Sequence, residues 1–136
     1  MASITAENYL KALYALAEVP RGPVAISTLA AHLGVSKPTA NSMIRRLNEQ
    51  GMLDYRKYQP LQLTAAGQRA AEAIVRKHRL TEMFLVEVMG FDEAAVHEIA
   101  EQIEHVQSPA FFARMDELMG FPRVDPHGSP IPGGRE

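Results

Sequence analysis

Apolar residues in the first fifty positions recur every three or four residues, the spacing that places side chains on one face of a helix. This pattern predicts helices over residues 5–16, 28–33 and 37–50. The segment Pro20–Pro23, with its prolines and glycine, is expected to end the first helix. The beginning of the chain is therefore predicted to be helical.

The second and third predicted helices are joined by the short turn Gly34-Val35-Ser36. Ser36 is expected to cap the third helix, with Pro38 in its first turn, where a missing N–H has no partner to lose. Ser27 is the expected cap of the second helix, and Gly51 is expected to end the third. Two short helices joined in this way predict a helix-turn-helix.

Beyond Gly51 the apolar positions alternate with a period of two, which is typical of β-strands. Residues 52–56 and 60–64 are expected to pair as a hairpin around Lys57-Tyr58-Gln59. A helix-turn-helix followed by such a hairpin is typical of a winged-helix DNA-binding domain, which the pattern places at residues 1–64.

Helical spacing then returns and predicts helices over residues 65–89, 93–106 and 109–119. Thr64 and Asp92 are the expected caps of the first two. The last helix is expected to open at Ser108-Pro109.

The predicted fold is therefore mainly α. An N-terminal winged helix-turn-helix with a small β-hairpin wing is followed by an all-helical domain over residues 65–121. Residues 122–136 are rich in proline and glycine, and we expect an irregular tail or linker there.

The net charge of −2 conceals two parts of opposite sign. Residues 1–80 hold 11 Lys and Arg against 5 Asp and Glu, whereas residues 81–136 hold 3 against 11. A basic first part suits a polyphosphate partner and an acidic second part suits cations.

Several classes of protein are excluded by composition. The chain has no cysteine, which excludes a disulfide framework, a thiolate metal site and a cysteine nucleophile. No apolar run reaches the roughly 18 residues of a membrane span, and the start Met1-Ala2-Ser3-Ile4 lacks the features of a signal peptide. We therefore expect a cytoplasmic protein.

The start of the third helix carries small polar side chains that suit base edges in the major groove of double-stranded DNA. Asn41 could pair with adenine, and Pro38 and the Thr39 methyl could touch thymine methyls. Basic side chains here and at the hairpin tip suit phosphates, which fix register without reading sequence. The alternative is a helical pair used only for packing. The expected DNA contacts are Ser27, Ser36, Lys37, Pro38, Thr39, Asn41, Ser42, Arg46, Arg56, Lys57 and Tyr58.

A second set of side chains has the chemistry of a divalent-metal site. Two of its members, His78 and Glu82, share one face of the 65–89 helix because they are four residues apart. Imidazoles and carboxylates without a thiolate favour Mn(II) or Fe(II) over structural zinc. The other members project from one side of the 93–106 helix, and they are His97, Glu101, Glu104 and His105.

The bland alternative for this set is a solvated acidic helix face with occasional histidines. Two histidine–glutamate pairs at a spacing of four, together with Glu104-His105, favour metal binding. His32 and His127 lie outside the set and are expected on the surface and in a loop.

Motifs over nearly the whole chain match one known pattern. They are Glu7–Lys11, Leu33–Thr39, Leu63-Thr64 with Gly67, Arg76–Leu80 with Glu82, and Val96-His97 with Glu101, Ile103–His105 and Ser108. In these motifs the chain resembles the diphtheria-toxin-repressor and manganese-transport-regulator family of metal-dependent bacterial repressors.

The resemblance implies a DNA-binding transcriptional repressor of metal-homeostasis genes, not an enzyme. It implies activation by Mn(II) or Fe(II), with Zn, Co, Ni and Cd able to bind in vitro. Residues 65–121 would then be the metal-binding and dimerisation domain. A homodimer with reading helices about 34 Å apart would match a palindromic operator.

The resemblance also assigns the metal ligands. The regulatory site would use Glu101, Glu104 and His105 together with Asn8. An ancillary site would use His78, Glu82 and His97.

Three positions depart from one or the other branch of the family. Asn8 stands where aspartate or methionine is usual, and Lys11 stands where the manganese branch has a carboxylate. Glu101 replaces the cysteine of the iron branch, which favours Mn(II). These differences leave the choice between manganese and iron open.

Two alternative functions involve the same residues. A winged-helix regulator that senses an organic ligand would use the carboxylates only for solvation. A metal hydrolase built on His97-Glu98-x-x-Glu101 would need histidine in place of Glu101.

Two further expectations concern the C-terminal half of the chain. Residues 128–133 resemble the linker to an SH3-like domain that many relatives carry. The helical domain is expected to dimerise through apolar faces that include Phe84, Leu85, Phe111 and Phe112.

Overall fold

The computed structural model describes residues 3–18 and 23–133. It divides into two compact units, the first ending at Ala71 and the second beginning at Glu72. Each unit is described by itself. The predicted helix break at Pro20–Gly22 lies outside the described residues.

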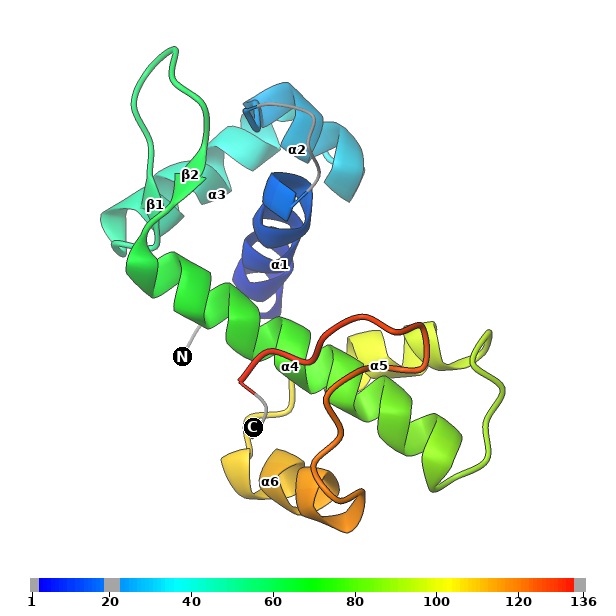
Figure 1. The fold of residues 1–136 in the computed structure, drawn as a ribbon. Helices are drawn as coiled ribbons and strands as arrows, with labels where there is room; N and C mark the ends of the chain where they lie inside the picture. Colours follow the sequence, from blue (N-terminus) through cyan, green and yellow to red (C-terminus); the bar gives the residue numbers. More distant parts are fainter. Residues whose placement is uncertain (1–2, 19–22, 134–136) are drawn as a thin grey trace. The chain divides into compact units, whose positions relative to one another are not determined.

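The first unit contains the predicted helix-turn-helix. Helices α1 (Ile4–Glu18), α2 (Ile26–Leu33) and α3 (Lys37–Glu49) bring their apolar faces together (Figure 1). The burial of apolar area on these faces is the main stabilising contribution. The side chains that this packing removes from solvent almost completely are Leu10, Leu29, Ile44, Leu47 and Leu53.

The turn between α2 and α3 forms as predicted, with Ser36 as the cap of α3. Gly34 adopts φ 69°, a left-handed conformation that glycine reaches without steric cost. The Ser36 hydroxyl accepts the Thr39 N–H at 3.2 Å and so caps α3. The predicted Ser27 cap is wrong, because α2 begins at Ile26 and no side chain caps it.

The wing, residues 53–63, is a hairpin with a long tip. Strands β1 (Leu53–Asp54) and β2 (Gln62–Leu63) pair antiparallel, with Leu53 opposite Leu63. Both strands are shorter than predicted, since the chain leaves the ladder after Asp54. The Leu61 N–H donates instead to the Val24 carbonyl at 2.8 Å, which ties the wing to the segment before α2.

A tight junction joins the wing to helix α4 (Ala65–Glu87). The Thr64 hydroxyl donates to the Gly51 carbonyl at 2.6 Å and accepts the Gly67 N–H at 3.1 Å, which confirms Thr64 as the cap. A Cβ on Gly67 would lie 1.9 Å from the Met52 carbonyl oxygen. The helix can therefore approach the end of the α3–wing connection only with glycine at this position.

The second unit contains the rest of α4, then α5 (Val96–Ile103) and α6 (Pro109–Leu118). Its core consists of side chains from α4, α6 and the C-terminal segment, with Phe84, Ile103 and Met119 packed against them. The buried members are Leu80, Phe112, Met115 and Ile131. Together with the wing, these helices confirm the predicted mainly α-helical fold.

Helix α5 is shorter at both ends than the predicted helix over residues 93–106. The Asp92 carboxylate accepts the Ala94 N–H at 3.2 Å within a separate turn, so Asp92 does not cap α5. At the other end, Glu104 is the C-terminal cap and His105 lies in the following turn. A helix cannot continue far here because the residue before Pro109 disfavours helical conformation.

The segment of residues 121–133 forms no named helix or strand, and it runs along α4 (Figure 1). Arg79 donates to the Pro130 carbonyl at 2.6 Å and Arg76 donates to the Pro132 carbonyl at 3.2 Å. Ile131 is 5% exposed. The predicted irregular segment is thus fastened to α4 by hydrogen bonds and apolar packing.

None of the described helices combines the length and the apolar character needed to cross a membrane.

We expect Gly67→Ala to destabilise the protein by about 2 kcal/mol, because the added methyl overlaps the Met52 carbonyl. This loss should exceed the gain of about 1 kcal/mol that alanine normally brings to a helix. Urea unfolding measures the change. Ala65→Gly, at an exposed position of the same helix, is the control for helix propensity. Equal stability of Gly67→Ala and the parent would show that the contact is not limiting.

Candidate metal centre and nucleic-acid interface

The metal centre is built on two buried side chains of α4. His78 and Glu82 are four residues apart and lie on one face, with only 6% and 2% of their surface exposed. His78 Nε2 is 3.2 Å from Glu82 Oε1. Burial of a carboxylate is costly unless charges or hydrogen bonds compensate it, so this pair needs further partners.

Helix α5 supplies a second histidine to Glu82. His97 Nδ1 lies 3.6 Å from Glu82 Oε2, and its Nε2 lies 2.7 Å from Glu101 Oε1. The rings of His78 and His97 meet edge to face, with centroids 4.8 Å apart. One donor atom from each of His78, Glu82 and His97 lies within 4.8 Å of the others, a separation that one metal ion could span.

The chain of imidazoles and carboxylates continues beyond His78. Glu104 has no exposed surface, and its Oε1 lies 2.8 Å from His78 Nδ1. His105 Nε2 is 3.9 Å from the other Glu104 oxygen. The two ring nitrogens of His78 therefore face two different carboxylates, and a neutral ring could donate to only one of them.

Sequence analysis missed a second group of donors. Glu82, Asp125 and His127 also bring one donor atom each within 4.8 Å of the others. The Asp125 Oδ1 accepts the N–H groups of His127 and Ser129, so this turn is held by Asp125 itself. His127, predicted as a loop residue, lies in a turn that carries a carboxylate and an imidazole two residues apart. The spacing of two residues between Asp125 and His127 was the one sign of this donor group in the sequence.

The Glu82 carboxylate is the shared member of both groups. Burial raises the pKa of Glu82, but the hydrogen bond from His78 and the positive charges of His78, His97 and His127 lower it more, and the net shift is downward. Its Oε2 has no hydrogen-bond partner among the described residues. A buried, ionised oxygen that faces imidazoles fits a bound cation, so the donors present suit a metal ion.

The residues assigned by resemblance to the regulatory site are arranged differently. Among the described residues, Glu101, Glu104 and His105 do not form a triad of donor atoms within 4.8 Å of one another. The Glu101 side chain is 52% exposed and pairs with His97. Asn8 is exposed on α1, in the first unit.

The expected DNA-reading side chains lie on the exposed side of α3. Ser36 and Thr39 join their hydroxyls at 2.8 Å, so both side chains are already hydrogen-bonded at the helix start. Asn41 is half-buried. Ser27 on α2 and the cap residue Ser36 are also exposed, and the exposed members on α3 itself are Lys37, Pro38, Thr39, Ser42 and Arg46.

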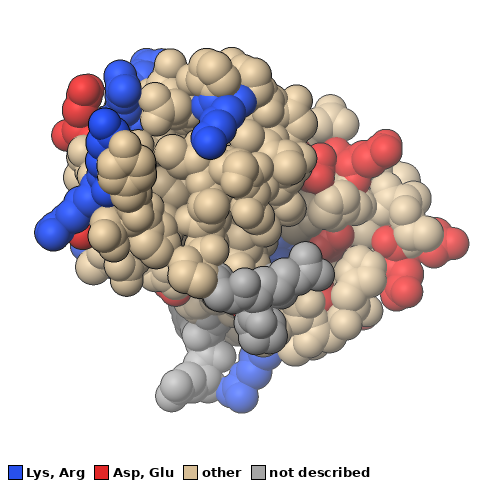
Figure 2. Space-filling model, turned by 90° about the horizontal axis from the view of Figure 1, so that it is seen from above, with Lys and Arg blue, Asp and Glu red and all other residues tan. Residues whose placement is uncertain are grey.

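The wing supplies the remaining expected contacts. Arg56, Lys57 and Tyr58 are exposed, and Arg56 Nε lies 3.6 Å from Asp54 Oδ1. Figure 2 looks onto the side of α2, α3 and the wing, where Lys and Arg side chains gather mainly along one edge of a largely uncharged surface.

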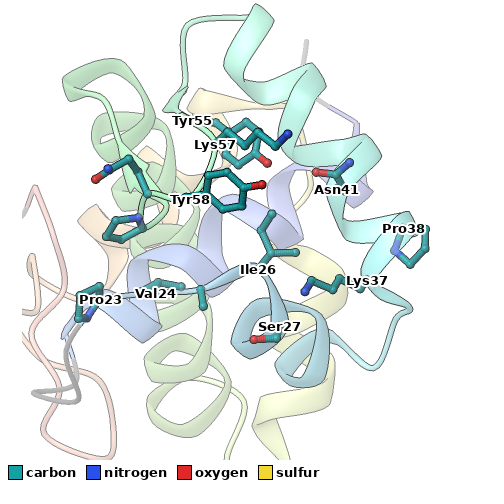
Figure 3. Close-up of a pocket in the computed structure, with 13 residues that line it drawn as sticks. Pro23, Val24, Ile26, Ser27, Lys37, Pro38, Asn41, Tyr55, Lys57 and Tyr58 are labelled. Carbon is teal, nitrogen blue, oxygen red and sulfur yellow. The ribbon is translucent and has the colours of Figure 1, made fainter.

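A groove of about 730 Å³ lies between the wing and the first turns of α2 and α3 (Figure 3). Val24 and Ile26 contribute apolar surface, Lys37 and Asn41 come from α3, and Lys57 comes from the wing. The groove is thus lined by side chains from both parts of the predicted DNA-binding surface.

Comparison with known families finds a match for each of the two parts of the chain. Residues 1–61 match the model of the iron dependent repressor N-terminal DNA binding domain, and residues 64–133 match that of its metal binding and dimerisation domain. The chain belongs to the iron-dependent repressor family. The resemblance inferred from the motifs is therefore confirmed, and neither family model describes an enzyme.

Relatives within this family include iron and manganese regulators. The chain is 36% identical to the iron-dependent repressor IdeR of Mycobacterium leprae and 34% identical to the diphtheria toxin repressor of Corynebacterium diphtheriae, over 129 residues in each case. These matches cover 95% of this chain and 56% and 57% of the relatives. A solved manganese-dependent transcriptional repressor in complex with manganese superposes with a TM-score of 0.86 at 45% identity, covering 96% of this chain and 60% of that one. The chain thus spans less than two thirds of the length of these relatives.

Removal of the Glu82 charge should make the free energy of unfolding less dependent on pH in the acidic range. Since the folded pKa of Glu82 is lowered, its ionised form adds stability above the unfolded value, and this is lost as the pH falls through the folded value. In metal-free protein with chelator, the difference in unfolding free energy between the parent and Glu82→Gln should therefore shrink below about pH 4.5. Urea unfolding across this range measures it. Glu93→Gln, at an exposed position, is the control, and a difference that stays constant with pH would contradict the assignment.

Proposed function

We propose that this protein is a metal-dependent DNA-binding transcriptional repressor that controls metal-homeostasis genes and is activated by Mn(II) or Fe(II). The observation that carries the proposal is the buried Glu82 carboxylate, which faces two histidines and belongs to both donor groups. Membership of the iron-dependent repressor family supports it. Such a repressor would act in the cytoplasm, where it meets the chromosome.

The proposed division of labour follows the sequence boundaries. Residues 1–64 would bind DNA, residues 65–121 would bind metal and dimerise, and residues 122–136 would be a tail or linker. Because Asp125 and His127 bring donor atoms close to Glu82, the beginning of that tail would share in metal binding.

The proposed metal ligands rest on the contacts among the described residues and on the family resemblance. His78, Glu82 and His97 would hold one ion, and Asp125 and His127 would extend the site from the shared Glu82. These ligands supply only nitrogen and oxygen, which suits Mn(II) and Fe(II). The regulatory site would use Asn8, Glu101, Glu104 and His105.

Occupation of the regulatory site would require the donors to exchange partners. Glu101 now pairs with His97, and Glu104 Oε1 now lies 2.8 Å from His78 Nδ1. A divalent ion would replace these imidazole contacts by direct bonds to the carboxylates. Zn, Co, Ni and Cd are expected to bind the same donors in vitro, and solved structures of the relative ScaR hold Zn²⁺ and Cd²⁺.

The second copy in a homodimer would cover exposed apolar side chains of the helical unit. Leu85 and Phe112 are buried within the chain itself, at 4% and 5%, so they are not available to form a dimer face as expected from the sequence. Phe111 remains available at 44% exposure. Other exposed apolar side chains in this unit are Val88, Met89, Phe91, Val106, Leu118 and Val124. The resulting two-fold symmetry would match a palindromic operator.

Metal should control DNA affinity. With a duplex selected from a random-sequence library in the presence of Mn(II), removal of metal by a chelator should weaken binding by roughly 5- to 150-fold, the range of typical allosteric coupling. Added Mn(II) or Fe(II) should restore it. Fluorescence anisotropy measures the affinity, with a buffer at matched ionic strength as the control because DNA binding depends steeply on salt. Affinity that does not respond to chelator would exclude a metal-dependent repressor.

Loss of the His127 imidazole should weaken metal binding. His127→Ala removes one donor of the Glu82, Asp125 and His127 group, so calorimetric titration with Mn(II) should show fewer bound ions or an affinity about 10-fold lower. His32→Ala removes an exposed histidine of α2 and is the matched control. Identical titrations for both variants would remove His127 from the metal centre.

A further inference from the structure

The guanidinium of Arg76 on α4 contacts two other segments of the second unit at once. Its Nη2 lies 2.9 Å from Asp116 Oδ2 on α6, and its Nη1 donates to the Pro132 carbonyl at 3.2 Å. Arginine can do this because its planar fork holds several N–H donors in fixed directions, whereas lysine presents a point charge. Neither partner belongs to the proposed metal ligands, so those ligands do not explain why arginine stands at this position.

Asp116 fixes the point at which the chain leaves α6. Its backbone carbonyl accepts the N–H groups of Met119 at 3.2 Å and of Phe121 at 2.9 Å. Phe121 adopts φ 61°, a left-handed conformation that is uncommon for a bulky residue, and the hydrogen bond to Asp116 holds it there. Asp116 is 5% exposed and its Oδ1 has no hydrogen-bond partner among the described residues, so the ion pair with Arg76 compensates a buried charge.

Residues 121–132 form a loop whose two ends are both held by this ion pair. The first end is Phe121, which is bound to the Asp116 carbonyl, and the second is Pro132, which is bound by Arg76. Figure 1 shows the chain leaving α6 and returning along α4. One guanidinium therefore closes the loop at both ends.

The two limbs of the loop are hydrogen-bonded to each other, so the closed ends determine the position of its tip. The Ile131 N–H donates to the Arg123 carbonyl at 2.8 Å, and the Asp125 N–H donates to the Ser129 carbonyl at 2.9 Å. The tip carries Asp125 and His127, whose donor atoms approach the buried carboxylate of the proposed metal centre. A change at the ends of the loop is therefore transmitted to these two donors.

We propose that Arg76 and Asp116 are positioning residues of the metal centre, because they close the loop that presents two of its donors. The inference rests on the proposed function, which assigns Asp125 and His127 as metal ligands. Neither positioning residue touches the ion. They restrict the loop before the ion arrives, so that less conformational entropy is lost when the ion binds.

The alternative is an ion pair that only stabilises the second unit. Buried ion pairs add little net stability because desolvation offsets much of their attraction, although loss of one partner is costly. A variant that keeps the positive charge and loses the fork separates the two roles. Arg76→Lys has this property, since one ammonium cannot reproduce both the Asp116 and the Pro132 contacts of the guanidinium.

The first test is calorimetric titration of the whole chain with Mn(II). Arg76→Lys should lower the affinity by about 10-fold, the lower end of the loss that follows when residues that orient metal ligands are changed. Asp116→Asn keeps the size of the side chain and removes its charge, and it should act in the same direction. Arg69→Lys changes an exposed arginine of the same helix and should leave the titration unchanged. If Asp116→Asn does not fold, Arg76→Lys carries the test.

A double-mutant cycle shows whether Arg76 acts through the loop donors. In a chain that carries Asp125→Asn and His127→Ala, Arg76→Lys should cause no further loss of Mn(II) affinity, because the loop no longer supplies both donors. Asparagine keeps an oxygen that can accept the N–H groups of the turn, so the loop itself is preserved. A further loss of the same size in this background would show that Arg76 acts only through stability, and would overturn the proposal.

Hydrogen exchange gives a readout without metal. In the presence of chelator, the amides of Asp125 and Ile131 should exchange several-fold faster in Arg76→Lys than in the parent, because both are hydrogen-bonded across the loop. The amides of α1 in the first unit should exchange as in the parent, which shows that the variant is folded. Unchanged exchange at both loop amides would show that the ion pair does not close the loop.

The outcomes distinguish this inference from the proposed function. A parent chain that binds no Mn(II) would overturn the metal-site assignment and the positioning role with it. Mn(II) binding that is weakened by His127→Ala and unaffected by Arg76→Lys would overturn the positioning role alone. Binding that is weakened by both changes, with no further loss in the cycle, would support both.

Discussion

A carboxylate buried to 2% exposure needs compensation from its surroundings, and Glu82 receives it from imidazoles on three different segments. His78 comes from the same helix, His97 from α5 and His127 from the C-terminal segment. Removal of an ion from water costs several kcal/mol, and the convergence of these three segments on Glu82 offsets part of that cost. The apolar core of the second unit and the contacts of this one carboxylate therefore favour the same arrangement of α4, α5 and the C-terminal segment.

The packing of the C-terminal segment holds His127 near Glu82. Ile131 fills a place in the core with Leu80, and Arg76 and Arg79 bind carbonyl groups of the segment. These contacts involve no metal-ligand atoms, but they fix the turn that carries His127. Apolar burial and backbone hydrogen bonds thus position a polar donor that could not be held there by its own charge.

Local patterns in the sequence were sufficient for the features that depend on neighbours in the chain. The spacing of four predicted the faces shared by His78 with Glu82 and by His97 with Glu101, and the period of two predicted the wing. Ser36 and Thr64 were predicted as caps because a cap is formed within four residues.

The features that the sequence did not reveal have two origins, a local turn that resembles a helix start and contacts across long separations. The start of α5 depends on a turn in which Asp92 satisfies Ala94, and a capping rule alone does not distinguish that turn from a helix start. The approach of His127 to Glu82 spans more than forty positions and requires the Ile131 packing described above. Because imidazoles and a divalent cation both supply positive charge to the same carboxylates, protons and metal must compete for this centre. An ion bound at the proposed metal site would therefore replace imidazole contacts that now help to balance the buried Glu82 carboxylate.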